Sequence, residues 1–133
     1  MKTCFIIMPF DPRYDPLLQR VLRPAAEAVG LRAERVDDIF RPGVILDDIK
    51  ACIRCASVLM AVLTDRNANV FYELGLAHAE GKAVILISNT MDDVPSDLRA
   101  HRILTYNKED PAWGTHLKKK IVGALEQMMA PAS

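Results

Sequence analysis

Residues 69–87, NVFYELGLAHAEGKAVILI, place a helix, its stop signal and a buried strand in direct succession. The first part predicts a helix over residues 69–81, and Gly81 stands at its end, where a left-handed C-terminal cap is commonly needed. Residues 83–88 then form an apolar run, as expected of a strand that is buried on both faces of a sheet. A helix that returns directly to a buried strand is the building unit of a parallel sheet covered by helices.

The same alternation of apolar runs and amphipathic stretches extends over the whole chain. The predicted strands are residues 4–10, 32–36, 57–63, 83–88 and 102–106. The predicted helices are residues 14–29, 43–56, 69–81 and 114–129, with a further short helical turn within 92–101. We therefore expect an α/β fold, namely a flavodoxin-like, doubly wound, five-stranded parallel sheet with helices on both faces. Gly30, like Gly81, should cap a helix, and Ser96 or Asp97 should cap the short turn.

Composition places the chain among globular proteins and argues against several classes of function. Its 133 residues have the size of one domain, so we expect a single unit over residues 1–133. The 17 basic and 17 acidic residues give zero net charge, which argues against a nucleic-acid polymer as partner. No apolar run is long enough for a membrane span, and the N-terminal residues lack the organisation of a signal peptide. We expect a cytoplasmic chain without a membrane partner.

The three cysteines lie in apolar segments, which suits a reducing compartment better than a disulfide framework. Cys52 and Cys55 form a C-x-x-C pair inside a predicted helix, without the preceding strand that a thioredoxin-like site requires. We interpret the pair as buried small apolar residues and expect neither a redox role nor a metal site.

Polar residues follow the predicted strands at the carboxyl edge of the sheet, where folds of this class bind ligands. After residues 57–63 the chain passes through Asp65, Asn67 and Asn69, all good helix N-caps, into a helix that carries Glu73. A helix start offers unpaired N–H groups and a positive potential, which hold a phosphate or stabilise an acidic side chain. One interpretation makes Asn69 the cap and Glu73 a first-turn acid that complements the helix dipole.

The other interpretation makes Glu73 a reagent. A lone, partly desolvated carboxylate at this place can attack the anomeric carbon of a ribosyl group or stabilise an oxocarbenium-like transition state, and both routes split an N-glycosidic bond. Either role needs Glu73 ionised but poorly hydrated. Phe10, Phe71 and Tyr72 would provide apolar walls and a surface on which a base stacks. This chemistry needs no cofactor, since NAD or a nucleotide would be the substrate.

Three segments of the chain together resemble bacterial proteins of the nucleoside 2-deoxyribosyltransferase-like group and the related TIR-like domains. They are FIIMPF at residues 5–10, LTDRNANVFYELGLAHAEGKAVILI at residues 63–87 and VPSDLRAHRILTY at residues 94–106. The glutamate-centred NVFYELG, followed by AHAEGK and a buried strand, is the most specific part. By its position in this motif, the resemblance implies that Glu73 is the catalytic residue.

The resemblance also implies which residues contact the substrate. The loop after the first strand is similar to the family's substrate-proximal loop, and its candidates are Pro9, Phe10, Asp11 and Tyr14. Asp38, after the second strand, is similar in placement to an acidic substrate contact, and Asp37 is the alternative. Arg41, together with Arg13 and Arg66, would suit the phosphates of a nucleotide.

The chain departs from the family's pattern at Asn67. Transferases that act on free deoxyribonucleosides have an acidic residue shortly before the glutamate, and asparagine cannot donate a proton as a carboxylic acid does. Asp65 either substitutes for this acid, or caps the helix or stabilises its loop. TIR-like enzymes that cleave the nicotinamide bond of NAD need less acid catalysis, because the charge on nicotinamide is neutralised as it leaves. The departure therefore favours hydrolysis over base exchange.

The leading hypothesis is an N-glycoside hydrolase that acts on NAD or a nucleotide, with Glu73 as the catalytic carboxylate and the helix start at Asn69 near the ribose or phosphate. The resemblance further implies a homo-oligomer and a TIR-like effector in bacterial anti-phage defence. A second hypothesis is a non-catalytic nucleotide-sensing or self-assembly module. A third is a nucleoside 2-deoxyribosyltransferase.

Overall fold

The computed structural model describes residues 2–35 and 46–130, and the strands in these residues form one sheet. The strands are β1 (Thr3–Ile7), β2 (Arg32–Arg35), β3 (Val58–Val62), β4 (Val84–Ser88) and β5 (Ile103–Thr105). All neighbouring strands run parallel, and their order across the sheet is β2-β1-β3-β4-β5. This is the flavodoxin-like order, so the predicted fold class is confirmed.

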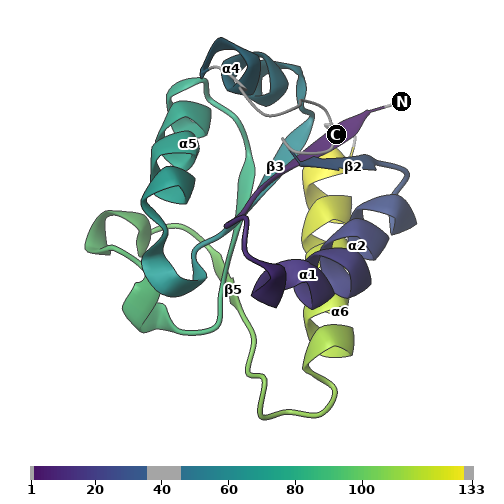
Figure 1. Cartoon of the computed structure of the whole chain (residues 1–133). Helices are drawn as coiled ribbons and strands as arrows, with labels where there is room; N and C mark the ends of the chain where they lie inside the picture. The colour runs from purple at the N-terminus through teal and green to yellow at the C-terminus, as the bar shows by residue number, and fades with distance from the viewer. Residues whose placement is uncertain (1, 36–45, 131–133) are drawn as a thin grey trace.

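Helices cover both faces of this sheet, as expected of a doubly wound fold (Figure 1). One face carries the helical segment 12–28 and α6 (Trp113–Met129), and the other carries α4 (Leu46–Cys55) and α5 (Ala68–Ala79). Successive residues of a strand point to opposite faces, so Ile6 packs in the first core while Phe5 and Ile7 pack in the second. Within the described residues, no helix is long and apolar enough to cross a membrane.

The first helical segment differs from the single helix predicted for residues 14–29. It consists of a 3-10 turn (Pro12–Tyr14), α1 (Asp15–Leu17), a π turn (Leu18–Leu22) and α2 (Arg23–Ala28). Pro24 accounts for the interruption, because proline has no N–H to donate to the carbonyl of Arg20 and its ring clashes with that carbonyl. The π turn directly before the proline widens the helix and accommodates it.

Proline also sets the end of β1. The sequence predicts a strand over residues 4–10, but β1 ends at Ile7. Pro9 lacks the N–H that a central strand needs for its ladder, so the chain leaves the sheet before it. Met8 and Pro9 remain buried, and Phe10 is the first exposed residue of the loop, with 62% of its surface accessible. This loop therefore leaves the core at the carboxyl edge of the sheet.

Two glycines end helices as predicted. Gly30 follows α2 at φ 80°, and Gly81 follows α5 at φ 72°, both in the left-handed region that favours glycine. The turn predicted within residues 92–101 consists of two 3-10 turns, Met91–Asp93 and Ser96–Leu98. The prediction that Ser96 or Asp97 caps it is wrong, because both residues already lie inside the second turn, which has no side-chain cap.

The cysteines do not all behave as small core residues. Cys4 is buried, and burial raises the pKa of its thiol to about 12. Cys52 is half-buried and Cys55 is exposed, so the interpretation of this pair as buried is wrong for Cys55. The reason is helical geometry, since the apolar side of α4 that meets the core carries Ile53 and Cys55 is turned away from it. All three thiols are free.

Candidate functional site

Asn67 is the N-cap of α5, at the carboxyl edge of the sheet. Its Oδ1 accepts hydrogen bonds from the backbone N–H groups of Asn69 at 2.9 Å and of Val70 at 3.2 Å. These are two of the four N–H groups that a helix start leaves without partners. The interpretation of Asn69 as the cap is therefore wrong, because that residue already lies inside the first turn.

The chain enters this cap through a left-handed turn. Asp65 has φ 67° and Arg66 has φ 55°, a region that residues other than glycine, asparagine and aspartate rarely adopt. The N–H of Asp65 donates to Asp93 Oδ2 at 2.9 Å, which ties the turn to the segment after β4. Asp65 therefore stabilises its loop and does not cap α5.

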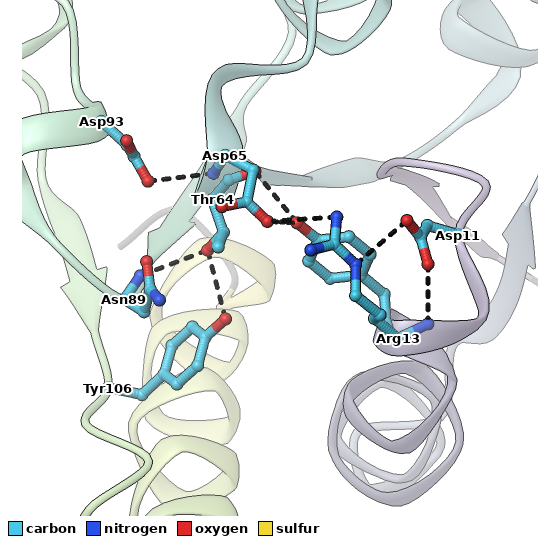
Figure 2. Close-up of polar contacts among 8 residues, drawn as sticks. Asp11, Arg13, Thr64, Asp65, Asn89, Asp93 and Tyr106 are labelled. Carbon is cyan, nitrogen blue, oxygen red and sulfur yellow. Dashed lines mark hydrogen bonds and ion pairs between the residues drawn. The ribbon is translucent and has the colours of Figure 1, made fainter.

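The side chain of Asp65 is held by Tyr14 and Arg13, and Figure 2 shows Arg13 between Asp65 and Asp11. The Tyr14 hydroxyl donates to Asp65 Oδ2 and lies 3.4 Å from the carbonyl oxygen of Thr64. Arg13 places Nη2 3.6 Å from the same Asp65 oxygen and Nε 3.0 Å from Asp11 Oδ2. The loops that follow β1 and β3 are thus joined by a continuous set of polar contacts from Asp11 to Asp65.

The pKa shifts in this network keep Asp11 ionised and Tyr14 protonated at neutral pH. Burial, with the hydrogen bond to Asp65, raises the pKa of Tyr14, so the phenol keeps its proton and acts as a donor. Hydrogen bonds from the backbone N–H and the guanidinium of Arg13 lower the pKa of Asp11. At neutral pH the Arg13 cation therefore lies between an ionised Asp11 and the acceptor oxygen of Asp65.

The two loops enclose a cavity of about 290 Å³, here called the switch cavity, where the strand order reverses between β1 and β3. It is lined by Pro9, Phe10, Asp11, Arg13, Tyr14, Asp65 and Asn67. All seven were singled out in the sequence, and folding brings them together from two separate loops. Arg13, expected to suit phosphates, supplies the only cationic group of the described lining.

Glu73 lies on α5, six residues after the cap, about 9 Å further along the helix axis, and does not line the switch cavity. It is half-buried and lies beside Val70 and Ala77 on the side of the helix that meets the core. Burial raises the pKa of its carboxyl to about 7. In the part of the chain that the structure describes, no hydrogen bond or ion pair reaches this side chain.

These observations contradict the structural interpretation of Glu73. The helix begins at Ala68, so Glu73 lies in the second turn, and no acidic residue occupies the first. An acid that complements the dipole of a helix start has a lowered pKa, whereas burial raises that of Glu73. Glu73 is a desolvated carboxylate rather than a capping acid.

The remaining expected residues fall in three places. Asn69 is exposed on the same side of α5 as Glu73, four residues before it, and lies outside the lining of the switch cavity. Phe71 packs into the core beneath α5 and forms no wall, whereas Tyr72 is 56% exposed. Asp38, its alternative Asp37 and Arg41 lie outside the described residues.

The sequence reasoning missed the residues that link this edge to β4 and β5. Thr64 is buried, with its Oγ1 3.1 Å from the Tyr106 hydroxyl and accepting the N–H of Asn89 at 3.2 Å (Figure 2). The available signal was the position of Thr64, a polar residue directly after the apolar strand that ends in Val62 and Leu63. A threonine at this position is typical of an ordinary loop, and only the structure shows that its hydroxyl faces that of Tyr106.

The site therefore combines a desolvated carboxylate on α5 with a polar cavity that holds carboxylates, a phenol, an amide and a guanidinium. Such groups hydrogen-bond sugar hydroxyls and phosphates. Among residues 2–35 and 46–130, no cluster of three or more histidine, cysteine or acidic side chains is placed to hold a metal ion.

Several solved structures share this fold. A 2-deoxyribosyltransferase from Leishmania mexicana has a TM-score of 0.57 and 22% identity, and the match covers 68% of this chain and 66% of the transferase. This chain therefore spans slightly less than two thirds of the length of the transferase. The TIR domain of a Toll-related receptor from Hydra magnipapillata has a TM-score of 0.66 and 17% identity, over 91% of this chain and 98% of that domain. A metazoan TIR-STING receptor from C. gigas has a TM-score of 0.62 and 17% identity, over 98% of this chain and 41% of the receptor.

No protein-family model matches the chain, and no curated protein matches it. The identities to the solved structures are low, so they establish the fold and nothing finer. The resemblance expected from the sequence is confirmed at this level: the chain has the fold of a deoxyribosyltransferase and of TIR domains.

Proposed function

We propose that this protein hydrolyses the N-glycosidic bond between base and ribose in NAD or a nucleotide, with Glu73 as the catalytic carboxylate. The observation that carries the proposal is the state of this side chain, which is half-buried, has no partner among the described residues and has a pKa raised to about 7. A poorly hydrated carboxylate interacts strongly with positive charge that develops beside it. The anomeric carbon develops such a charge in an oxocarbenium-like transition state.

In the proposed reaction the bond from C1′ of the ribose to the base nitrogen breaks, and its electron pair leaves with the base. Glu73 either attacks C1′ and is released by water, or stabilises the cation while water attacks directly. In both routes water supplies the new C1′–O bond. With NAD the second proton of the water passes to solvent, whereas the base that leaves a nucleotide takes up a proton. The products are the free base and a ribosyl group with a hydroxyl at C1′.

The cap of α5 favours NAD over a neutral nucleoside as the substrate. The Oδ1 of Asn67 is engaged with two backbone N–H groups, and an amide has no acidic proton to give to a leaving base. Asp65 does not replace the missing acid, since its carboxylate accepts from Tyr14 and pairs with Arg13. Nicotinamide needs no proton, because it already carries the charge that is neutralised on departure.

The switch cavity would hold the polar part of the substrate. Its guanidinium, from Arg13, suits a phosphate, and the carboxylates of Asp11 and Asp65 suit ribose hydroxyls. Asn67, which lines the cavity, and Glu73 are separated by about 9 Å along the axis of α5. A nucleotide bound in the cavity would reach Glu73 by extending along the first turns of this helix.

The test is a base-release assay on the full chain, with NAD and with nucleoside monophosphates, analysed by chromatography. Free base is expected with NAD, and Glu73→Gln should lower its release at least 100-fold. Glu126→Gln, an exposed glutamate on α6, is the matched control and should retain full activity. No release from any of these substrates, at concentrations where size exclusion shows a homo-oligomer, would refute the proposal, as would equal activity of the Glu73 variant.

A second candidate function is a non-catalytic nucleotide-sensing or self-assembly module. Two of the solved structures with this fold are the TIR domain of a receptor and a TIR-STING receptor, and this chain exposes Phe10 at 62% in the loop after β1 and Tyr72 at 56% on α5. Aromatic side chains exposed to this extent are enriched at protein interfaces. Isothermal titration separates the candidates, since the module predicts nucleotide binding in an oligomeric preparation without release of base.

A biological role as an effector of bacterial anti-phage defence belongs to the first candidate. It predicts that expression in bacteria lowers the NAD content of infected cells. The same cells carrying Glu73→Gln should keep their NAD, which links the effect to this carboxylate.

A further inference from the structure

A second cavity, of about 570 Å³, lies on the same edge of the sheet, between the ends of β4 and β5 and the first half of α6. It shares no lining residue with the switch cavity and is here called the α6 cavity. The side chains that matter for binding are Asn89, Tyr106, Asp110, Trp113, His116 and Lys120. Its volume falls within the range of about 300–1,000 Å³ that small-molecule sites occupy.

One wall of the α6 cavity is aromatic. The rings of Tyr106 and Trp113 have centroids 5.3 Å apart and planes tilted by 30°. The ammonium of Lys108 lies 5.7 Å from the centre of the Trp113 ring. An exposed contact of this kind contributes about 0.5–1 kcal/mol, whereas a base stacked on an aromatic side chain contributes about 1–3 kcal/mol. A planar base can therefore displace Lys108 from the indole.

His116 and Lys120 line the α6 cavity from the same face of α6 as Trp113, three and seven residues further along the helix. His116 Nδ1 lies 2.7 Å from Asp110 Oδ2, which fixes the orientation of the imidazole, and Asp110 Oδ1 is occupied by the N–H of Ala112 at 2.9 Å. Lys120 donates one of its three protons to the carbonyl oxygen of Thr105 at 3.2 Å, which leaves two for a ligand. An imidazole and an ammonium held in this way suit a phosphate.

We propose that the α6 cavity binds a nucleoside 5′-phosphate. The base stacks on Trp113, the amide of Asn89 hydrogen-bonds its edge, and the phosphate contacts His116 and Lys120. Two sources carry this chemistry. One is a free mononucleotide, and the other is the distal nucleotide of a dinucleotide whose other half occupies the switch cavity.

A single residue connects the two cavities. Thr64 contacts the hydroxyl of Tyr14 through its carbonyl oxygen and that of Tyr106 through its Oγ1, at 3.4 and 3.1 Å. One tyrosine lines each cavity, so the two sites lie on either side of Thr64. The dinucleotide source rests on the proposed function, whereas binding of a nucleoside 5′-phosphate does not.

Trp113 provides the test, because it is the single tryptophan of the chain and its fluorescence reports on this cavity alone. AMP added to the full protein should give saturable quenching, with adenosine and inorganic phosphate each much weaker. His116→Gln and Lys120→Gln should each weaken AMP binding about fivefold to tenfold. Lys119→Gln, the neighbouring exposed lysine outside this cavity, is the matched control and should bind as the unaltered protein does.

Absence of saturable quenching up to millimolar AMP would overturn the proposal. So would an equal loss of affinity in the Lys119 variant, or unchanged affinity in both cavity variants with folding verified by circular dichroism. Competition by AMP against NAD in base release identifies the distal half of a dinucleotide, and binding without competition identifies a free mononucleotide. The quenching does not depend on catalysis, and Glu73→Gln should show it in full, so a failure of the proposed hydrolysis remains distinguishable.

Discussion

The hydroxyl of Tyr14 donates a hydrogen bond to the carboxylate of Asp65, which lies 51 residues further along the chain. Tyr14 is buried and Asp65 is exposed, so the bond anchors a surface turn to the core. Tyr14→Phe should lower the free energy of unfolding by about 1 kcal/mol, because the hydroxyl donates to a charged acceptor that water partly screens.

A double-mutant cycle isolates this bond. Asp65→Gly keeps the left-handed backbone and removes the acceptor, and the double variant should be more stable than the sum of the single losses by about 1 kcal/mol. Urea unfolding of the four proteins measures the coupling. Tyr72→Phe, at an exposed tyrosine, is the control and should change stability by less than about 0.5 kcal/mol. Purely additive losses would show that the bond contributes nothing.

The cap of α5 makes a prediction that separates two neighbouring asparagines. Asn67→Ala should lower the free energy of unfolding by about 1 kcal/mol, because two backbone N–H groups lose their acceptor. Asn69→Ala should stay within about 0.5 kcal/mol of the unaltered protein, since its side chain is exposed and inside the helix. Asn67→Asp keeps an acceptor oxygen and should retain stability. Equal losses at both asparagines, in thermal or urea unfolding, would contradict the assigned cap.

The left-handed turn before α5 predicts an unusual gain from glycine. Arg66 has φ 55°, which costs a residue with a Cβ about 1–2 kcal/mol, while glycine costs about 0.5–1 kcal/mol in backbone entropy. Arg66→Gly should therefore raise the free energy of unfolding by about 0.5–1 kcal/mol. Lys119→Gly, in the regular part of α6, should lower it by about 1 kcal/mol. Calorimetry of both variants tests the opposite signs.

The raised pKa of Glu73 predicts a pH-dependent cost in stability. Its folded pKa of about 7 exceeds the ordinary value of 4.5, so the fold prefers the neutral acid. The cost is absent below about pH 4.5, grows between about pH 4.5 and 7, and is complete above that range. Glu73→Gln should therefore match the unaltered protein at pH 4 and exceed its stability at pH 8 by about 1–2 kcal/mol, allowing for partial solvent exposure. A stability difference that does not change with pH would disprove this assignment.

The same pKa predicts the pH profile of the proposed hydrolysis. The reactive form is the carboxylate, whose population rises about tenfold between pH 6 and pH 8 when the pKa is about 7. The kcat/KM for base release should rise over this interval with a midpoint near pH 7. A rate that falls over the same interval would show that Glu73 acts as an acid.

The sequence predicted the sheet and its covering helices because that information is local. The continuous apolar runs at 57–63 and 83–88 predict strands that are buried on both faces of a sheet. Gly30 and Gly81 each end a helix in the left-handed backbone conformation that favours glycine. The errors at element ends have a local cause as well. Pro9 and Pro24 lie inside otherwise regular patterns, and the missing N–H overrides hydrophobic periodicity.

The sequence predicted which residues belong to the candidate site but not which of them contact one another. Residue type and motif position pointed to all seven residues that line the switch cavity. The sequence does not distinguish Asn67 from Asn69 as the N-cap of the helix, because each asparagine has an amide oxygen that can accept from the backbone N–H groups. Only the left-handed turn at Asp65 decides which of the two stands where the helix begins.

The sequence by itself determined the order of strands and helices and marked Glu73 as an acid in an apolar setting. The tertiary structure alone decided that Asp65 pairs with Tyr14 and that Thr64 meets Tyr106. It also decided that burial raises the pKa of Glu73 to about 7. The physical reason is that backbone conformation follows from neighbours in the chain, whereas desolvation and hydrogen bonding depend on groups that only the packed sheet brings together.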